Sequence, residues 1–229
     1  MIDAGDTGIA DIYIKHVSAW APGINNSNEW DEWALGKRNI SPEKKTPDLS
    51  FAEPMFKRRL SQISKMTIQV THDLKLSPDT KIIFFSYRGE LGRQFQINKM
   101  LIEENALSPA SFSLSVFNAP AALATMALGL KGGYSCVYPG NNSFSSCLTM
   151  VKAALLGSSL EEIAFIYADE EPPVEYNCLF NEPFLAISFG FLLTKIKNNN
   201  APVLPSANEN ETPITYLKKL LAGGIHVGS

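Results

Sequence analysis

The chain has 229 residues, 45% of them hydrophobic, and a formal net charge of −3 at pH 7. This composition is typical of a globular protein with one good core, and the slightly acidic balance gives no electrostatic reason to expect nucleic acid or an anionic membrane surface as a partner. No apolar run approaches the roughly 20 residues that span a bilayer, and the acidic N-terminal stretch lacks a signal-peptide core, so we expect a cytoplasmic protein that is not in a membrane.

The first fifty residues predict one strand and one long connection. Asp11 to Trp20 has the pattern of a strand. Residues 21–50 contain several prolines and glycines, so we expect a long loop that is packed by its own aromatic side chains, Trp30 and Trp33.

Two helices and a strand are predicted next. From Met55 to Leu74 apolar residues recur at every third or fourth position, which indicates one amphipathic helix. Residues 81–86 have the composition of a buried strand, and residues 90–105 that of a second helix.

Helices and strands continue to alternate through the second half of the chain. Val116 to Leu128 is rich in alanine and uncharged, which predicts a helix buried on most sides. The next predicted elements are a strand at 134–138, a helix at 143–156, and strands at 162–168 and 184–193. This alternation indicates an α/β domain with a parallel or mixed sheet.

The composition changes near residue 197. Residues 197–212 are rich in Asn, Glu, Pro and Ser, which favours a flexible polar loop, and a short helix is predicted at 214–221. We therefore expect one domain over 1–196, followed by a polar loop and short C-terminal helix over 197–229.

The stretch from 132 to 147 has the surroundings of a catalytic elbow, because a strand meets Pro139 and Gly140 and a helix begins at Ser143. Asn141 and Asn142 occupy the turn, and a carboxamide is neither a nucleophile nor a proton carrier at neutral pH.

Other reactive residues lack a catalytic setting. Ser143 fits a helix cap better than a nucleophile because no local base is present, and Cys136 and Cys147 fit small packing residues. The three cysteines have no metal-ligand spacing, so we expect no zinc site, no disulfide framework and no cofactor. The histidines are scattered along the chain, at His16, His72 and His226.

Two polar segments follow predicted strands, where open α/β sheets place binding groups. The acidic run 169–171 is interpreted as a solvated loop before two prolines, with a binding role as the alternative. Tyr87 and Arg88 are candidates to line a pocket, and Gly89 would permit a close backbone approach.

Residues 115–157, SVFNAPAALATMALGLKGGYSCVYPGNNSFSSCLTMVKAALLG, resemble the β-ketoacyl synthase family around its active-site cysteine. In that family a Ser-x-x-Asn helix leads through a Gly-Leu-Lys/Arg-Gly turn to a strand, an elbow that bears the cysteine, and a buried helix. The matching parts here are Ser115 and Asn118, residues 129–132, residues 136–138, and the helix from Ser143. The likeness extends over about residues 11–193 and implies a thiolase-like fold.

The departures from the family pattern imply a retired active site. Counting from Gly132, the family's nucleophilic cysteine falls at Asn141, and the second half of the family's fold, with its two catalytic histidines, has no counterpart here. The resemblance therefore implies a truncated, single thiolase-like half that is similar to chain-length factors. The nearest class is the small ketosynthase-like subunit of bacterial aryl polyene biosynthesis.

The same resemblance implies a partner and an interface. Chain-length factors pair with a catalytic ketosynthase, so we expect a heterodimer that acts on an acyl chain bound to acyl carrier protein through that partner. In the family the strand before the elbow lies at the dimer interface, which would place Tyr134 and Tyr138 against the partner. Ser111, Phe112 and Val116 would lie at the floor of its acyl tunnel, with Asn118 beside the pocket.

Two alternatives remain open at this stage. One is a degenerate acyltransferase or ketosynthase that uses Cys147 or Ser143 with a distant histidine. The other is an α/β scaffold module whose likeness to synthases is only ancestral.

Overall fold

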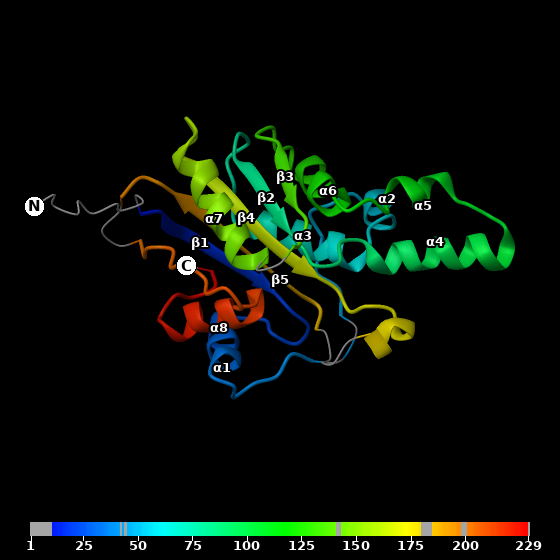
Figure 1. The fold of residues 1–229 in the computed structure, drawn as a ribbon, viewed down its shortest axis with the longest axis horizontal. Helices are drawn as coiled ribbons and strands as arrows, with labels where there is room; N and C mark the ends of the chain where they lie inside the picture. The colour runs from blue at the N-terminus through cyan, green and yellow to red at the C-terminus, as the bar shows by residue number, and fades with distance from the viewer. Residues whose placement is uncertain are drawn as a thin grey trace, which may run out of the picture.

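A five-stranded mixed sheet forms the centre of the computed structural model, which describes residues 11–41, 43, 45–140, 143–179, 185–197 and 201–228 (Figure 1). The strands are β1 (Tyr13–Trp20), β2 (Lys81–Phe85), β3 (Tyr134–Val137), β4 (Glu162–Asp169) and β5 (Ile187–Thr194), in the spatial order β1-β5-β4-β2-β3. β2 is parallel to both β3 and β4, whereas β5 is antiparallel to β4 and to β1. The predicted α/β half-fold with a mixed sheet of about five strands is confirmed.

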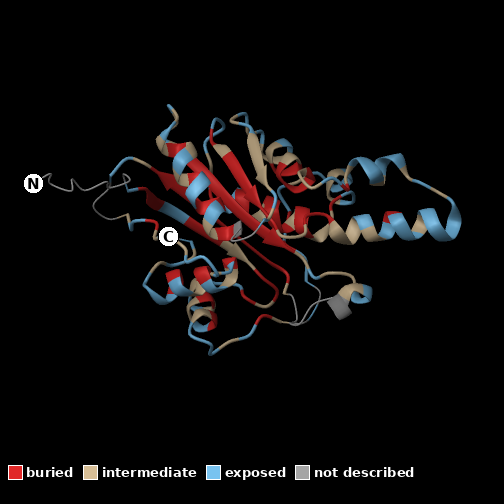
Figure 2. Cartoon of the chain, viewed as in Figure 1, coloured by how far each residue is buried: buried red, intermediate tan, exposed pale blue. Residues whose placement is uncertain are grey.

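Helices cover both faces of this sheet. Successive strand side chains point to opposite faces, and each face carries apolar side chains that belong to its own hydrophobic cluster. On one face Phe85, Phe165 and Phe191 pack against α7 (Ser143–Leu156), α8 (Pro213–Ala222) and α1 (Ser27–Ala34). On the other face Phe84 and Ile166 pack against α3 (Gln62–Asp73) and α6 (Ala119–Leu128). Figure 2 shows the sheet as the most buried part of the molecule.

The single helix predicted over 55–74 is wrong, because two helices share this stretch. α2 (Pro54–Lys57) ends before Ser61, whose side chain accepts a hydrogen bond from the Ser64 N–H and caps α3. Because the Ser61 side chain accepts a hydrogen bond from a backbone N–H of the next turn, a new helix begins after Ser61, even though the apolar spacing continues across this position.

The long loop predicted at 21–50 contains a helix, α1, that begins after the N-cap Asn26. Trp30 and Trp33 are buried as expected and meet edge to face with ring centroids 5.3 Å apart, but both lie on α1. They pack with α8, which follows them by almost two hundred residues, so local sequence carried no sign of this contact.

A helical arm, α4 (Leu91–Glu104) followed by α5 (Pro109–Ser113), projects from the body of the molecule (Figure 1). The helix predicted from Val116 starts instead at Ala119 as α6, and the separate short helix α5 precedes it. Ser108 caps α5 and Pro109 stands in its first turn, a position that proline fits.

The predicted C-terminal helix is present as α8, and its apolar residues belong to the core on the α7 face. Tyr216 is fully buried and donates a hydrogen bond to the Pro205 carbonyl at 2.7 Å. Leu204 is also buried, and its N–H donates to the Ile12 carbonyl next to β1. Within the described residues, no helix has the length and apolar character required to cross a membrane.

Candidate functional site at the carboxyl edge of the sheet

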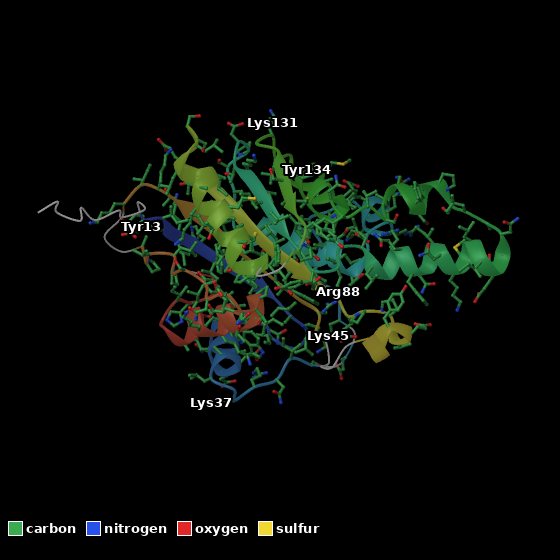
Figure 3. All side chains as sticks on the ribbon, in the orientation of Figure 1. Tyr13, Lys37, Lys45, Arg88, Lys131 and Tyr134 are labelled. Carbon is green, nitrogen blue, oxygen red and sulfur yellow. The ribbon has the colours of Figure 1, made fainter. Side chains whose placement is uncertain are left out.

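The carboxyl ends of the parallel strands β2, β3 and β4 meet at one edge of the sheet. Ser86–Glu90 follow β2, Tyr138 follows β3, and Asp169 ends β4 with Glu170 after it. Figure 3 shows Arg88 at this edge, near the end of β4, and Tyr134 on β3. This is the edge at which open α/β sheets carry their binding groups.

Asp169 holds the turn after β2 in place. Its carboxylate accepts hydrogen bonds from the Ser86 hydroxyl at 2.8 Å, from the backbone N–H groups of Tyr87 and Arg88 at 3.1 Å each, and from the Tyr167 hydroxyl at 2.8 Å. The residue is only 2% exposed. The predicted candidates Tyr87 and Arg88 are thus fixed by a buried carboxylate on the neighbouring strand.

The interpretation of 169–171 as a solvated loop is wrong for two of its three residues. Asp169 is buried and Glu170 is half-buried, whereas Glu171 is exposed. Burial raises the pKa of Asp169, although the Arg88 charge and the hydrogen bonds from Ser86 and Tyr87 oppose this rise. Most of the partners come from the turn after β2 and from the first turns of α3 and α4, which are distant in sequence, so the acidic run alone indicated only a polar segment.

A second acidic node, which the sequence analysis missed, lies beside the first. Glu90 is fully buried, and its Oε1 accepts hydrogen bonds from the Ser61 and Ser64 hydroxyls at 2.6 and 2.7 Å. Its Oε2 accepts from Arg93 Nε at 3.2 Å. The only local signal was the Glu-x-x-Arg spacing at the start of α4.

Glu170, the residue after β4, joins this node. Its Oε2 accepts from the Ile63 N–H at 3.0 Å, and its carboxylate also accepts from the Gly92 N–H. Burial first, and the Glu90 charge second, raise the pKa of Glu170 to about 7 against the lowering effect of these N–H groups and Arg93.

Asn118 and Tyr134, predicted for different roles, are brought together. The Asn118 Nδ2 donates to the Tyr134 hydroxyl at 3.0 Å, which links the start of α6 to the start of β3. The close approach expected at Gly89 is confirmed: its φ is +55°, and a Cβ there would lie 2.6 Å from the Phe117 ring. Phe117 in turn packs against Tyr138 with ring centroids 5.3 Å apart.

Large apolar side chains are exposed after β3, on α6 and in the segment 109–118 before α6. β3 pairs with β2 alone in the described sheet and is its edge strand, as the resemblance implied. The exposed fractions here are 75% for Tyr138, 71% for Met126, 57% for Phe112 and 45% for Val116. The apolar helix α6, predicted to be buried on most sides, therefore presents Met126 outward.

A cavity of about 810 Å³ opens between α4 and the segment after β4. Its lining includes Ser111, Glu170, Arg93 and Met100. Of the predicted site residues, Ser111 borders this cavity, whereas Tyr87, Arg88 and Asn118 are not among the residues that line it. A role for those three in a pocket stays a prediction.

The elbow itself falls partly outside the described residues. Asn141, the position of the family's nucleophile, lies outside them, and Ser143 is described only as the first residue of α7. Cys147 is 1% exposed, and burial raises its pKa to about 12. Burial also raises the pKa of Cys136 to about 11, so neither thiol is ionised at neutral pH.

The histidines lie in separate places. His72 Nδ1 is 3.0 Å from Asp73, His226 Nδ1 is 3.1 Å from Asp31, and His16 is exposed on β1. Over the described ranges, no group of three or more His, Cys, Asp or Glu side chains is arranged to hold a metal ion.

The fold is similar to solved ketosynthase structures. A chain of the ketosynthase ApeO in complex with its chain length factor ApeC from Xenorhabdus doucetiae is 24% identical, with a TM-score of 0.76, over 93% of this chain and 92% of that chain. A chain of the ishigamide ketosynthase/chain length factor is 12% identical with a TM-score of 0.67, over 85% of this chain and 64% of that chain.

A longer synthase shares the fold over a smaller part of its length. The ketosynthase from module 6 of the bacillaene synthase of Bacillus subtilis 168 is 14% identical with a TM-score of 0.60, over 84% of this chain and 38% of that chain. A search of the curated proteins found no match. The family model described as the N-terminal domain of β-ketoacyl synthase matches residues 30–218, and this chain therefore belongs to the β-ketoacyl synthase N-terminal domain family.

Proposed function

We propose that this chain is a non-catalytic, chain-length-factor-like subunit that pairs with an active β-ketoacyl synthase and shapes its acyl tunnel. The observation that carries the proposal is the set of exposed apolar side chains near the edge strand: Tyr138 follows β3, Met126 lies on α6, and Phe112 and Val116 precede α6. Tyr138 packs on the ring of Phe117, the residue after Val116. Exposed apolar side chains that lie together on a protein surface favour an interaction site.

The state of the thiols supports a non-catalytic role. A thiolate is the nucleophile in acyl transfer, and a buried thiol with a raised pKa is neither ionised nor accessible to a thioester. Cys147, the candidate of the alternative reading, is packed in the core with Phe144, Leu148 and Val151. The partner would then supply the nucleophilic cysteine and the histidines.

The size of one structural neighbour supports pairing. The similarity to a chain of the ApeO–ApeC complex extends over 92% of that chain, so a chain of about this length takes part in a pair of ketosynthase and chain length factor. With the resemblance to the small aryl polyene subunit, this leads us to propose a polyketide or fatty-acid-type system of the aryl polyene class, in which the acyl chain stays on acyl carrier protein at the partner.

Co-expression with the candidate full-length ketosynthase tests the proposal. We expect the two chains to co-purify as a heterodimer, and the Cys147→Ala and Ser143→Ala variants to leave product formation by the complex unchanged. Intact-mass spectrometry after incubation with an acyl thioester should find no acyl adduct on this chain. A covalent adduct that disappears in either variant would instead establish the acyltransferase alternative, and a stable monomer that binds no ketosynthase would favour the scaffold module.

A further inference from the structure

The arm formed by α4 and α5 is attached to the body mainly at its base. Ile97 is the one buried residue of α4, and Leu101 and Ile102, further out, are 48% and 82% exposed. Figure 2 shows most of α4 as exposed or intermediate surface. The direction of the arm therefore depends on the contacts of its first turn.

Several of those contacts are polar, and most of them involve two carboxylates, Glu170 beside the sheet and Glu90 at the start of α4. Glu170, at the end of β4, accepts hydrogen bonds from the N–H groups of Ile63 in α3 and Gly92 in α4. Glu90 ties the same two helices through the Ser61 and Ser64 hydroxyls. Arg93 adds a 2.8 Å hydrogen bond to the Arg59 carbonyl just before α3.

The fit between Gly92 and Glu170 is specific. A Cβ at position 92 would lie 2.8 Å from Glu170 Oε1, so any side chain larger than hydrogen would displace the carboxylate. The backbone at this position does not itself require glycine, because its φ lies outside the left-handed region. Glycine costs about 1 kcal/mol relative to alanine within a helix, and the close approach of the carboxylate explains its presence here.

We propose that Glu170 is a positioning residue, a clamp that joins the first turns of α3 and α4 and thereby sets the direction of the α4–α5 arm relative to the sheet. Ser111 and Phe112 lie on that arm. The clamp would therefore set where these two residues lie against a ketosynthase. That consequence rests on the proposed function, but the clamp itself does not.

Charged groups surround the clamp on several sides. Glu90 and Arg93 of α4 act on the carboxylate directly, and Arg88 Nη1 donates to the Glu170 carbonyl at 3.4 Å. α3 faces it with the Ile63 N–H, and Glu43, Lys45, Glu171 and Glu175 line the same cavity. Because the pKa of Glu170 is raised, detachment that exposes the carboxylate becomes easier as the pH rises towards 7.

Hydrogen–deuterium exchange of the full chain tests the clamp, with exchange of 91–104 measured relative to β4 as the reference for the global fold. Gly92→Ala and Glu170→Ala should each raise the relative exchange roughly fivefold, the size expected for a lost helix-capping contact. In wild type, the relative exchange of 91–104 should rise between pH 5 and 7.5 as Glu170 loses its proton. Glu170→Gln keeps one acceptor and does not titrate, so its relative exchange should match wild type at pH 5 and should not rise over this interval.

Two controls separate the clamp from general effects. Glu171→Ala removes an exposed neighbour of Glu170 and should behave as wild type. Asn98→Ala, at an exposed position of α4, raises helix propensity without touching the clamp and should leave exchange unchanged or slower. The proposal is overturned if Gly92→Ala slows exchange as Asn98→Ala does, if Glu170→Ala matches wild type, or if the pH dependence persists in Glu170→Gln.

Product analysis of the co-expressed complex then addresses the proposed function separately. If Gly92→Ala changes exchange and also broadens the product-length distribution, the arm acts at the tunnel. If exchange changes and products do not, the clamp stands and the proposed tunnel role of the arm fails.

Discussion

The Asn118 side chain donates a 3.0 Å hydrogen bond to the Tyr134 hydroxyl and so joins the helix that follows the arm to the edge strand β3. Both side chains are half-buried, and β3 itself has no fully buried residue. The edge strand, which presents its free side to any partner, is therefore held by polar and aromatic contacts as well as by its pairing with β2.

Removing this hydrogen bond should lower the stability by about the same amount whether Tyr134 or Asn118 is substituted. We expect Tyr134→Phe to lower the free energy of unfolding by about 1 kcal/mol, the usual net value of one such bond. Asn118→Ala should cost a similar amount, and the double variant should be less destabilised than the sum of the two. Urea unfolding measures all three, and simple additivity would show that the bond contributes nothing of its own.

Loss of the Asp169 carboxylate should be far more damaging. Asp169→Ala leaves the buried Ser86 and Tyr167 hydroxyls without their acceptor and releases the Tyr87–Arg88 turn. We expect a loss of about 3 kcal/mol or more in urea unfolding, as for other broken buried networks. Glu171→Ala, which changes an exposed residue two positions further on, is the matched control and should cost less than about 0.5 kcal/mol. Equal effects of the two would contradict the role given to Asp169.

Glu170 should make the stability of the fold depend on pH in a defined direction. Its folded pKa of about 7 lies above the ordinary value of 4.5, so between these values the folded state binds more protons than the unfolded state. The stability that protonation contributes is present below about pH 4.5 and is lost as the pH rises to about 7. The urea midpoint of wild type minus that of Glu170→Gln should fall over this interval and be constant above it. A difference that is flat from pH 4.5 to 8 would show that burial does not perturb this carboxyl.

The two thiols described here should be poor nucleophiles in the folded protein. Their raised pKa values, about 11 for Cys136 and about 12 for Cys147, leave almost no thiolate at pH 8. Peptide mass spectrometry after brief treatment with iodoacetamide should find Cys147 unmodified and Cys136 modified slowly, with both labelled rapidly in urea. Rapid native labelling of Cys147 would reopen the acyltransferase alternative.

Side-chain size on α5 and in the segment that follows it should control product length in a ketosynthase complex. We expect Phe112→Ala to lengthen the products and Val116→Trp to shorten them, because a bulky group at a tunnel end excludes further carbons by overlap. Folding should be unaffected, since these side chains are 57% and 45% exposed. Ile102→Ala, at an 82% exposed position near the far end of α4, is the control and should leave the products unchanged. Chromatography of the released chains gives the readout, and unchanged products in both test variants would remove these residues from the tunnel.

Local patterns were sufficient for the sheet and most of its helices. The strands β2 and β4 are continuous apolar runs because both of their faces are covered. Such a run can be recognised as a buried strand without knowing which elements pack on it. The resemblance in residues 115–157 added the order of the elements and the place of β3 at the edge. Prediction from local patterns failed at α1 and at the break before α3. Asn26 and Ser61 each cap the start of a helix through one side chain, and the apolar periodicity gives no sign of such a cap.

The candidate site was accessible to sequence analysis only in part. That Tyr87, Arg88 and the acidic run lie at the ends of strands, that Cys147 is a packing residue of the core, and that no cysteine stands at the elbow were all evident from residue type and order. The tertiary structure decided that Asp169 is buried and that Glu170 meets Gly92, because their partners lie some eighty to one hundred residues away in sequence. Burial and hydrogen bonding, which set the protonation and role of a carboxylate, depend on what the fold places around it, and the identity of its sequence neighbours does not encode that.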